Sequence, residues 1–98
     1  MKLRLTPTAE ADVHDIYAWY KNQGEYLAPE FRRDLDACLN RVSRNSLGYP
    51  KVYGEIRRAL LRRFPYCVFY VGSESEVVVI GVFHAHRAPE VWQSRQDT

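Results

Sequence analysis

The fold is decided by residues 66–83, which read YCVFYVGSESEVVVIGVF. Two apolar runs, residues 66–71 and 77–83, flank a short segment of glycine, serine and glutamate, as is typical of two antiparallel strands joined by a tight turn. The second run is apolar at both odd and even positions, which predicts a strand inside the sheet with both faces covered. Its seven residues are far fewer than the roughly 20 that a membrane-spanning helix needs.

The residues that precede this hairpin give strand, helix and loop signals in turn. Residues 2–6 alternate polar and apolar side chains, as a short half-buried strand does. Residues 6–24 open with a threonine–proline helix start, keep helical apolar spacing and reach a glycine stop. Residues 28–46 predict a second helix, so the short gap between the two indicates an antiparallel helical hairpin. Residues 48–50 are expected to form a loop, and residues 56–64 a further strand that ends before Pro65.

The predicted order is therefore β-α-α-β-β-β, which is an α+β fold. We expect the helical hairpin to pack on one face of a small, mostly antiparallel four-stranded sheet. Residues 89–92, which begin with a proline, add a short C-terminal helical turn. No repeat or linker interrupts the chain, so residues 1–98 are expected to form a single domain.

Composition excludes several classes of protein. With 98 residues, of which 46% are hydrophobic, the chain can bury one modest core and is not a disordered tail. Lys2 and Arg4 are followed by Leu-Thr-Pro rather than by an apolar stretch, so we predict no secretory signal, no membrane segment and a cytoplasmic location. Cys38 and Cys67 lie far apart in apolar surroundings, which predicts buried free thiols rather than a disulfide or a metal site.

Charge is distributed unevenly along the chain. The net charge is only +2, but residues 7–31 carry a net −4 and residues 51–63 a net +4. Arginines outnumber lysines by eleven to three, and guanidinium groups bind carboxylates and phosphates in a bidentate manner. The basic block is either a solvated sheet edge that resists aggregation or a docking patch for an acidic partner, protein or nucleic acid. The candidates for charge pairing are Arg57, Arg58, Arg62 and Arg63.

Three residues at the end of the last predicted strand can carry chemistry, namely His84, His86 and Arg87. On a strand the two histidines point to the same face, about 7 Å apart. Imidazole groups titrate near neutral pH and serve as general acids or bases. The alternatives are a metal site, for which the sequence offers only scattered carboxylates as a third ligand, and a histidine bound to a backbone carbonyl at the sheet rim. Because the chain has no catalytic triad order and no glycine-rich phosphate loop, spacing alone reveals neither an enzyme nor a cofactor.

Several segments together resemble the RelE/ParE toxin superfamily. They are residues 56–58, 63–66, 69–70 and 82–89, with Trp92 and Arg95, and the first-helix residues Ala9, Asp12, Ile16 and Tyr20. The resemblance covers nearly the whole chain in the right order. It implies a ParE-like toxin, or plasmid stabilisation protein, of a bacterial type II toxin–antitoxin system. The fold that it implies agrees with the β-α-α-β-β-β order.

The superfamily contains two activities. RelE-like members are metal-independent endoribonucleases that cut messenger RNA on the ribosome, and ParE-like members bind and trap DNA gyrase. In a nuclease, His84 or His86 would act as acid or base and Arg87 would hold the scissile phosphate. RelE-like enzymes carry arginine at the position of Cys67 and a late tyrosine at the position of Trp92, so the resemblance favours the ParE-like activity.

The resemblance also implies partners. A cognate antitoxin with an acidic or amphipathic segment is expected to wrap the toxin, and operator DNA is contacted only through that antitoxin. Trp92 either covers the end of the sheet or anchors a partner from an exposed position. A degenerate member that binds antitoxin without being toxic remains a third alternative.

Overall fold

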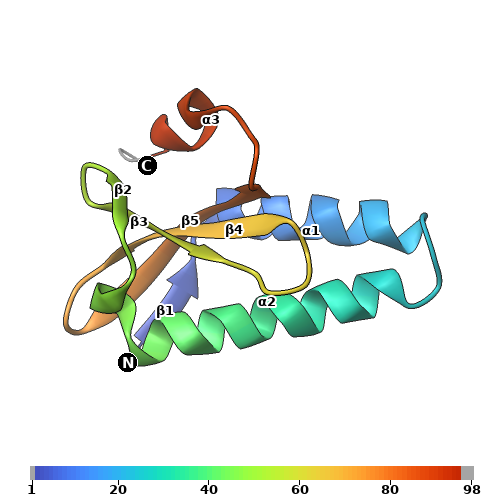
Figure 1. Ribbon diagram of the computed structural model, residues 1–98, viewed down its shortest axis with the longest axis horizontal. Helices are drawn as coiled ribbons and strands as arrows, with labels where there is room; N and C mark the ends of the chain where they lie inside the picture. Colours follow the sequence, from blue (N-terminus) through green and yellow to red (C-terminus); the bar gives the residue numbers. More distant parts are fainter. Residues whose placement is uncertain (1, 96–98) are drawn as a thin grey trace.

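The structure, a computed structural model, describes residues 2–95, so the expected domain of residues 1–98 extends beyond the described part at both ends. Figure 1 shows a central sheet with helices on both sides. The elements are β1 (Lys2–Leu5), α1 (Pro7–Lys21), α2 (Leu27–Arg44), the 3-10 helix η1 (Ser46–Gly48), β2 (Lys51–Tyr53), β3 (Ile56–Leu60), β4 (Tyr66–Gly72), β5 (Glu76–His84) and α3 (Pro89–Gln93). The α+β fold predicted from the sequence is confirmed.

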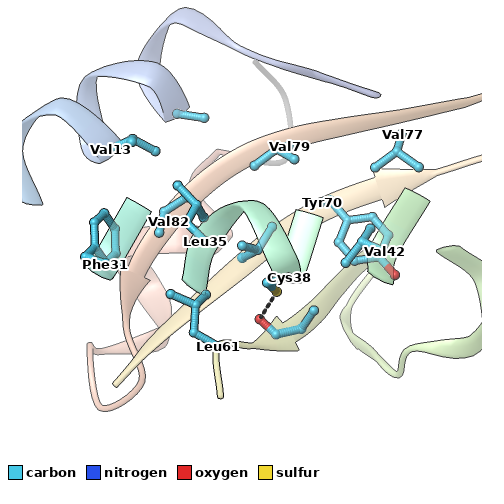
Figure 2. Close-up of a cluster of buried hydrophobic side chains, with 13 residues drawn as sticks. Val13, Phe31, Leu35, Cys38, Val42, Leu61, Tyr70, Val77, Val79 and Val82 are labelled. Carbon is cyan, nitrogen blue, oxygen red and sulfur yellow. Dashed lines mark hydrogen bonds between the residues drawn. The ribbon is translucent and has the colours of Figure 1, made fainter. Parts of the chain in front are cut away.

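The helical hairpin forms as its sequence predicts. The Thr6 hydroxyl caps α1 by accepting the Ala9 N–H at 3.2 Å, and Pro7 occupies the first turn, where no backbone donor is needed. On α2 the inward stripe is fully buried and consists of Phe31, Leu35, Cys38 and Val42. Figure 2 shows this stripe packed on valines of β5 and on Tyr70 of β4. The hairpin therefore covers one face of the sheet and contributes to the larger core.

The sheet has the strand order β1-β5-β4-β3-β2. β1 pairs with β5 in parallel, and all the other neighbours are antiparallel. β5 lies between β1 and β4, and its buried side chains point to both faces, as the two-sided apolar pattern predicts. This strand ends at His84, the first of the three residues predicted to act as acid, base or phosphate ligand.

The sheet contains one strand more than the four that the sequence predicts. β2 pairs Lys51 with Arg57 and Tyr53 with Ile56, and it lies just after the expected loop. Gly54 makes the connecting turn with a φ of 54°, a left-handed conformation that favours glycine. Three residues are too few for a period of two to be recognised, which is why this strand was not predicted.

β3 is shorter than the predicted strand of residues 56–64, since it ends at Leu60. The Asp34 carboxylate on α2 accepts the backbone N–H groups of Arg63 at 2.9 Å and of Phe64 at 2.8 Å. These two donors are therefore bound to a side chain rather than to a neighbouring strand. The correction places the last residues of that segment in a bend tied to α2.

A second, smaller core lies on the other face of the sheet. It consists of Ile56, Cys67, Phe69, Ile80, Phe83 and Trp92. The C-terminal helix α3 covers this face, on the opposite side of the strands from α2 (Figure 1). Within residues 2–95, no helix combines the length and the apolar character needed to cross a membrane.

Candidate functional site

An open pocket of about 320 Å³ lies at the end of β5, between α1 and α3. Three chain segments meet there because β5 ends beside α1 and the chain then turns back into α3. The lining residues are Asp12, Asp15 and Ile16 of α1, Tyr66 of β4, Val82, Phe83 and His84 of β5, and Arg87, Val91 and Arg95 from the C-terminal segment. Two of the three residues predicted to carry chemistry, His84 and Arg87, line this pocket.

His84 and His86 lie side by side, with ring centroids 5.6 Å apart. His84 is the last residue of β5 and His86 belongs to the turn that follows, so the pair is not on one continuous strand. The His86 backbone N–H donates to Nδ1 of His84 at 3.2 Å. This nitrogen must therefore be unprotonated, which places the proton of neutral His84 on Nε2. Nε2 of His84 can then donate a hydrogen bond to a bound group.

Arg87 is held at the rim of the pocket. Its backbone N–H donates to the His84 carbonyl at 2.9 Å, and its guanidinium lies 5.8 Å from the centre of the Phe83 ring. Among residues 2–95, no carboxylate forms an ion pair with it. The group is thus available to bind a carboxylate or a phosphate.

Tyr66 was not recognised from the sequence as part of this site. Its ring meets the His84 ring edge to face, with centroids 5.5 Å apart. It also contacts Tyr20, whose pKa is raised to about 12 by burial, and further by Tyr66 itself. The feature that could have identified Tyr66 as a site residue is the antiparallel pairing of the two strands, because β4 pairs Tyr66 directly with His84.

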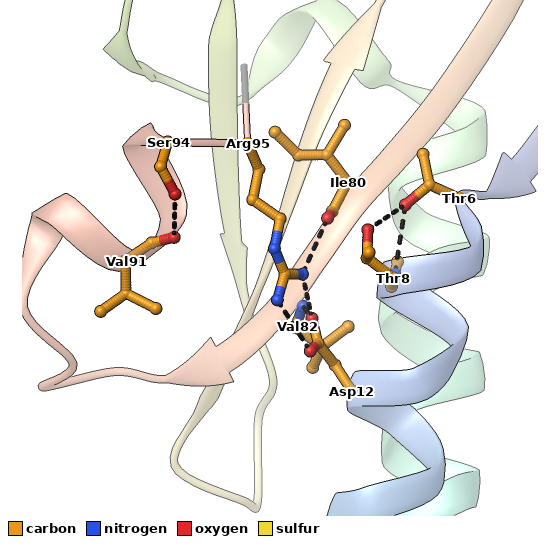
Figure 3. A network of polar contacts seen from close by, with 9 residues as sticks. Thr6, Thr8, Asp12, Ile80, Val82, Val91, Ser94 and Arg95 are labelled. Atoms are coloured by element: carbon orange, nitrogen blue, oxygen red, sulfur yellow. Dashed lines mark hydrogen bonds and ion pairs between the residues drawn. The ribbon is translucent and has the colours of Figure 1, made fainter. Parts of the chain in front are cut away.

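The pocket wall contains an ion pair that the sequence did not reveal. Arg95 donates from Nη1 to Asp12 Oδ2 at 2.6 Å and from Nη2 to Oδ1 at 3.1 Å, and it also binds the Ile80 carbonyl at 3.2 Å. Asp12 Oδ2 accepts the Val82 backbone N–H as well, at 3.0 Å. Figure 3 shows Arg95 reaching across β5 to α1. The pair joins α1, β5 and the end of α3 into one wall.

Gly81 makes room for this ion pair. A Cβ atom at position 81 would lie 2.7 Å from Phe83 Cε2, 3.1 Å from Arg95 Nη1 and 3.4 Å from Asp12 Oδ2. The Arg95 guanidinium also lies over the Phe83 ring, 4.6 Å from its centre. The glycine inside the apolar run is therefore a position of close approach.

Trp92 is buried, with 7% of its surface exposed. Its ring stacks on Phe69 with centroids 4.7 Å apart and an interplanar angle of 16°. Of the two interpretations of Trp92, the structure thus favours the one in which it covers the sheet.

The four arginines of the basic block lie away from the pocket and in different surroundings. Arg57 donates to the carbonyls of Leu47 and Tyr49, and Arg63 pairs with Glu30 at 3.2 Å. Arg62 is exposed in the bend after β3, and Arg58 is half-buried on the strand. The structure therefore does not bring the four together as one patch.

Metal ligands are not grouped in the described part of the chain. Among residues 2–95, no three histidine, cysteine, aspartate or glutamate side chains lie close enough to hold a metal ion. The pocket combines imidazole, phenol and guanidinium groups, which can bind anions and transfer protons, with the carboxylates of Asp12 and Asp15.

Comparison with known proteins places these features in context. Residues 3–89 match a family model described as the ParE toxin of type II toxin–antitoxin system, parDE. Among solved structures, the chain is similar to one from the chromosomal ParDE TA system of P. aeruginosa, with a TM-score of 0.75 and 22% sequence identity. That match covers 86% of this chain and 95% of the other, and at such identity it concerns the fold. No curated protein sequence matches the chain.

Proposed function

The chain belongs to the ParE toxin family of type II toxin–antitoxin systems, and we propose that it inhibits growth by binding DNA gyrase. The observation that carries this proposal is the family match, which spans residues 3–89 and so includes the hairpin, the sheet and most of the pocket. We further propose that it acts in the cytoplasm, contributes to plasmid stabilisation and contacts operator DNA only through its antitoxin. Its cognate antitoxin is the partner that family membership implies.

Two positions support binding over RNA cleavage. Cys67 occupies the position at which RelE-like nucleases carry arginine, and it is fully buried in the second core. Burial raises the pKa of its thiol, so it supplies neither a permanent positive charge nor a ready thiolate. Trp92 occupies the position of the late tyrosine, has no hydroxyl group and is stacked on Phe69. Neither side chain can take the role that a nuclease would require of it.

One observation favours the alternative, a RelE-like ribonuclease. The pocket places Tyr66, His84 and Arg87 together, and the His86 ring lies beside the His84 ring. In such an enzyme one of His84 and His86 would accept the proton of a ribose 2′-hydroxyl, the other, as imidazolium, would donate a proton to the leaving oxygen, and Arg87 would bind the phosphate.

Expression of the chain alone in a bacterial host separates these functions. Gyrase binding predicts growth arrest, with plasmid DNA that loses negative supercoiling while messenger RNA stays intact. Messenger RNA cut at defined codons, in wild type but not in His86→Ala, would instead establish the nuclease. Losing one such group typically lowers the rate about 10²- to 10⁴-fold. Normal growth at full expression would identify the degenerate, non-toxic member.

A further inference from the structure

One arginine of the basic block differs from the others in how its charge is satisfied. Arg57 binds two backbone carbonyls, Arg63 pairs with Glu30, and Arg62 is exposed to solvent. Arg58 is half-buried, and its Nε is buried and has no hydrogen-bond partner among residues 2–95. Buried donors in proteins are nearly always paired, so Arg58 is the arginine of this block whose guanidinium group the described residues leave incompletely satisfied.

Arg58 lies on the face of the sheet opposite the helical hairpin. It follows Ile56 by two residues on β3, and Ile56 belongs to the second core. In the β3–β4 register it pairs with Phe69, the residue on which Trp92 stacks. Its positive charge also acts on the nearby Cys67 thiol of the same core. The guanidinium group therefore lies at the margin of an apolar surface.

That margin exposes further apolar side chains. Leu60 follows Arg58 on the same face of β3 and is 56% exposed. Val52 and Val71 are only half-buried and pack against the second core from β2 and β4. We call these four residues, Val52, Arg58, Leu60 and Val71, the open strip. β2 and β3 are the last two strands of the sheet, and beyond Arg57 only the Pro50 carbonyl, which accepts the Arg58 backbone N–H at 3.2 Å, continues their pairing. Arg58 and Leu60 therefore lie near the edge of the sheet.

Within residues 2–95, no acidic side chain forms an ion pair with Arg58. Glu55, in the adjacent turn, pairs with Lys51 at 2.9 Å, and Glu76, on the same face of the sheet, pairs with Arg4 at 2.8 Å. Among residues 2–95, Arg58 thus has no carboxylate within ion-pair distance. A single cation within apolar surroundings matches a single carboxylate flanked by apolar side chains.

We propose that the open strip is an antitoxin-binding surface, on which one aspartate or glutamate of the antitoxin forms a charge-assisted hydrogen bond with Arg58 while its apolar neighbours cover Leu60 and Val71. This inference rests on the proposed function, since it takes the cognate antitoxin as the occupant. Guanidinium groups bind carboxylates through two parallel N–H donors, which requires the planar fork that lysine lacks. Of the four arginines, Arg58 is accordingly the one that dominates antitoxin affinity.

The test measures the affinity of the purified chain for the purified product of the gene adjacent to its own, by calorimetry, at one fixed salt concentration. Arg58→Leu should weaken binding at least about 30-fold, because it leaves a carboxylate unpaired in the interface. The affinity of Arg58→Lys should lie between those of Arg58→Leu and wild type. The matched control, Arg62→Leu, removes the same charge from the same block at an exposed position and should weaken binding less than about fivefold.

Thermal unfolding of the free chain distinguishes binding from a structural role. Arg58→Leu should unfold at the wild-type temperature or higher, because it removes an unpaired buried donor. A lowered unfolding temperature with unchanged affinity would overturn the inference. So would loss of gyrase inhibition with unchanged antitoxin affinity, which would assign the strip to the target. If the wild-type chain does not bind the adjacent gene product, the antitoxin part of the proposed function fails as well.

Changing each aspartate and glutamate of that gene product to its amide locates the partner group. One substitution should weaken binding to wild type and have no further effect on binding to Arg58→Leu. Additive effects at every position would contradict the proposed pair.

Discussion

Arg95 and Asp12 lie 83 residues apart in the sequence and form a bidentate ion pair, with N–O distances of 2.6 and 3.1 Å. Both side chains are largely buried, at 21% and 15% exposure. Asp12 also holds the Val82 backbone N–H, and Arg95 also holds the Ile80 carbonyl. The pair therefore links the segment that follows α3 to α1 and β5. It forms one wall of the pocket that contains His84 and Arg87.

Arg95→Ala should lower the free energy of unfolding by about 2 kcal/mol, because it leaves a largely buried carboxylate with only one backbone donor. For a chain of this size the thermal midpoint should fall by roughly 8–16 °C. Thermal unfolding followed by circular dichroism measures the change, with Arg62→Ala as an exposed arginine control that should leave the midpoint at its wild-type value. Equal midpoints for Arg95→Ala and wild type would show that the ion pair does not hold α3.

Gly81→Ala should lower the free energy of unfolding by about 1–3 kcal/mol, because the added methyl group would overlap Phe83 and press on Arg95. Gly24→Ala is the control, since its Cβ would meet only the flexible end of Leu27, at 3.2 Å. Urea denaturation of the single variants and of Gly81→Ala/Arg95→Ala gives the coupling between the two positions. The destabilisations of the two single variants, Gly81→Ala and Arg95→Ala, should sum to more than the destabilisation of the double variant. Strict additivity would argue against a shared contact.

Stability should fall as the pH rises from about 10 toward 12. Burial raises the pKa of Tyr70 to about 12, and its hydroxyl donates to the Ser46 carbonyl at 2.5 Å. In the unfolded chain a tyrosine ionises near pH 10, so the unfolded state loses its proton first and is favoured above that pH. Tyr70→Phe lacks this group, and its stability deficit relative to wild type should narrow between pH 10 and 12. Urea midpoints at pH 8, 10 and 11 test this, and a constant deficit would refute it.

Both thiols should react only slowly with disulfide reagents in the folded chain. Cys38 and Cys67 are fully buried, and burial raises the pKa of Cys38 to about 11. Because disulfide reagents react with the exposed thiolate, labelling at pH 8 should be at least about 100-fold slower in buffer than in urea. Both thiols should react once the chain is unfolded. Rapid labelling of one thiol in the native protein would contradict its burial.

The sequence predicted those features that depend on local patterns. The threonine–proline start and the apolar spacing of residues 6–24 identified α1, and the two-sided apolar run of β5 identified a strand inside the sheet. It missed β2, which is too short to show a period, and it extended β3 past Leu60 because the Asp34 carboxylate that binds the following bend comes from α2.

The site was predicted only in part, because some of its residues are brought together by contacts between distant segments. His84 and Arg87 stand close together in the sequence and were recognised, whereas Asp12 and Tyr66 reach the pocket through the packing of α1 and the pairing of β4. Trp92 carried two interpretations, and only the position of α3 over Phe69 distinguished them. Tertiary contacts between distant segments leave no periodic signal in a single sequence.

The most direct test of the gyrase proposal is a supercoiling assay with purified DNA gyrase, relaxed plasmid, ATP and increasing amounts of the purified chain. The account predicts that supercoiling is inhibited as the chain approaches the gyrase concentration, and that prior addition of the adjacent gene product restores it. Full supercoiling in the presence of a large excess of folded chain would contradict the account.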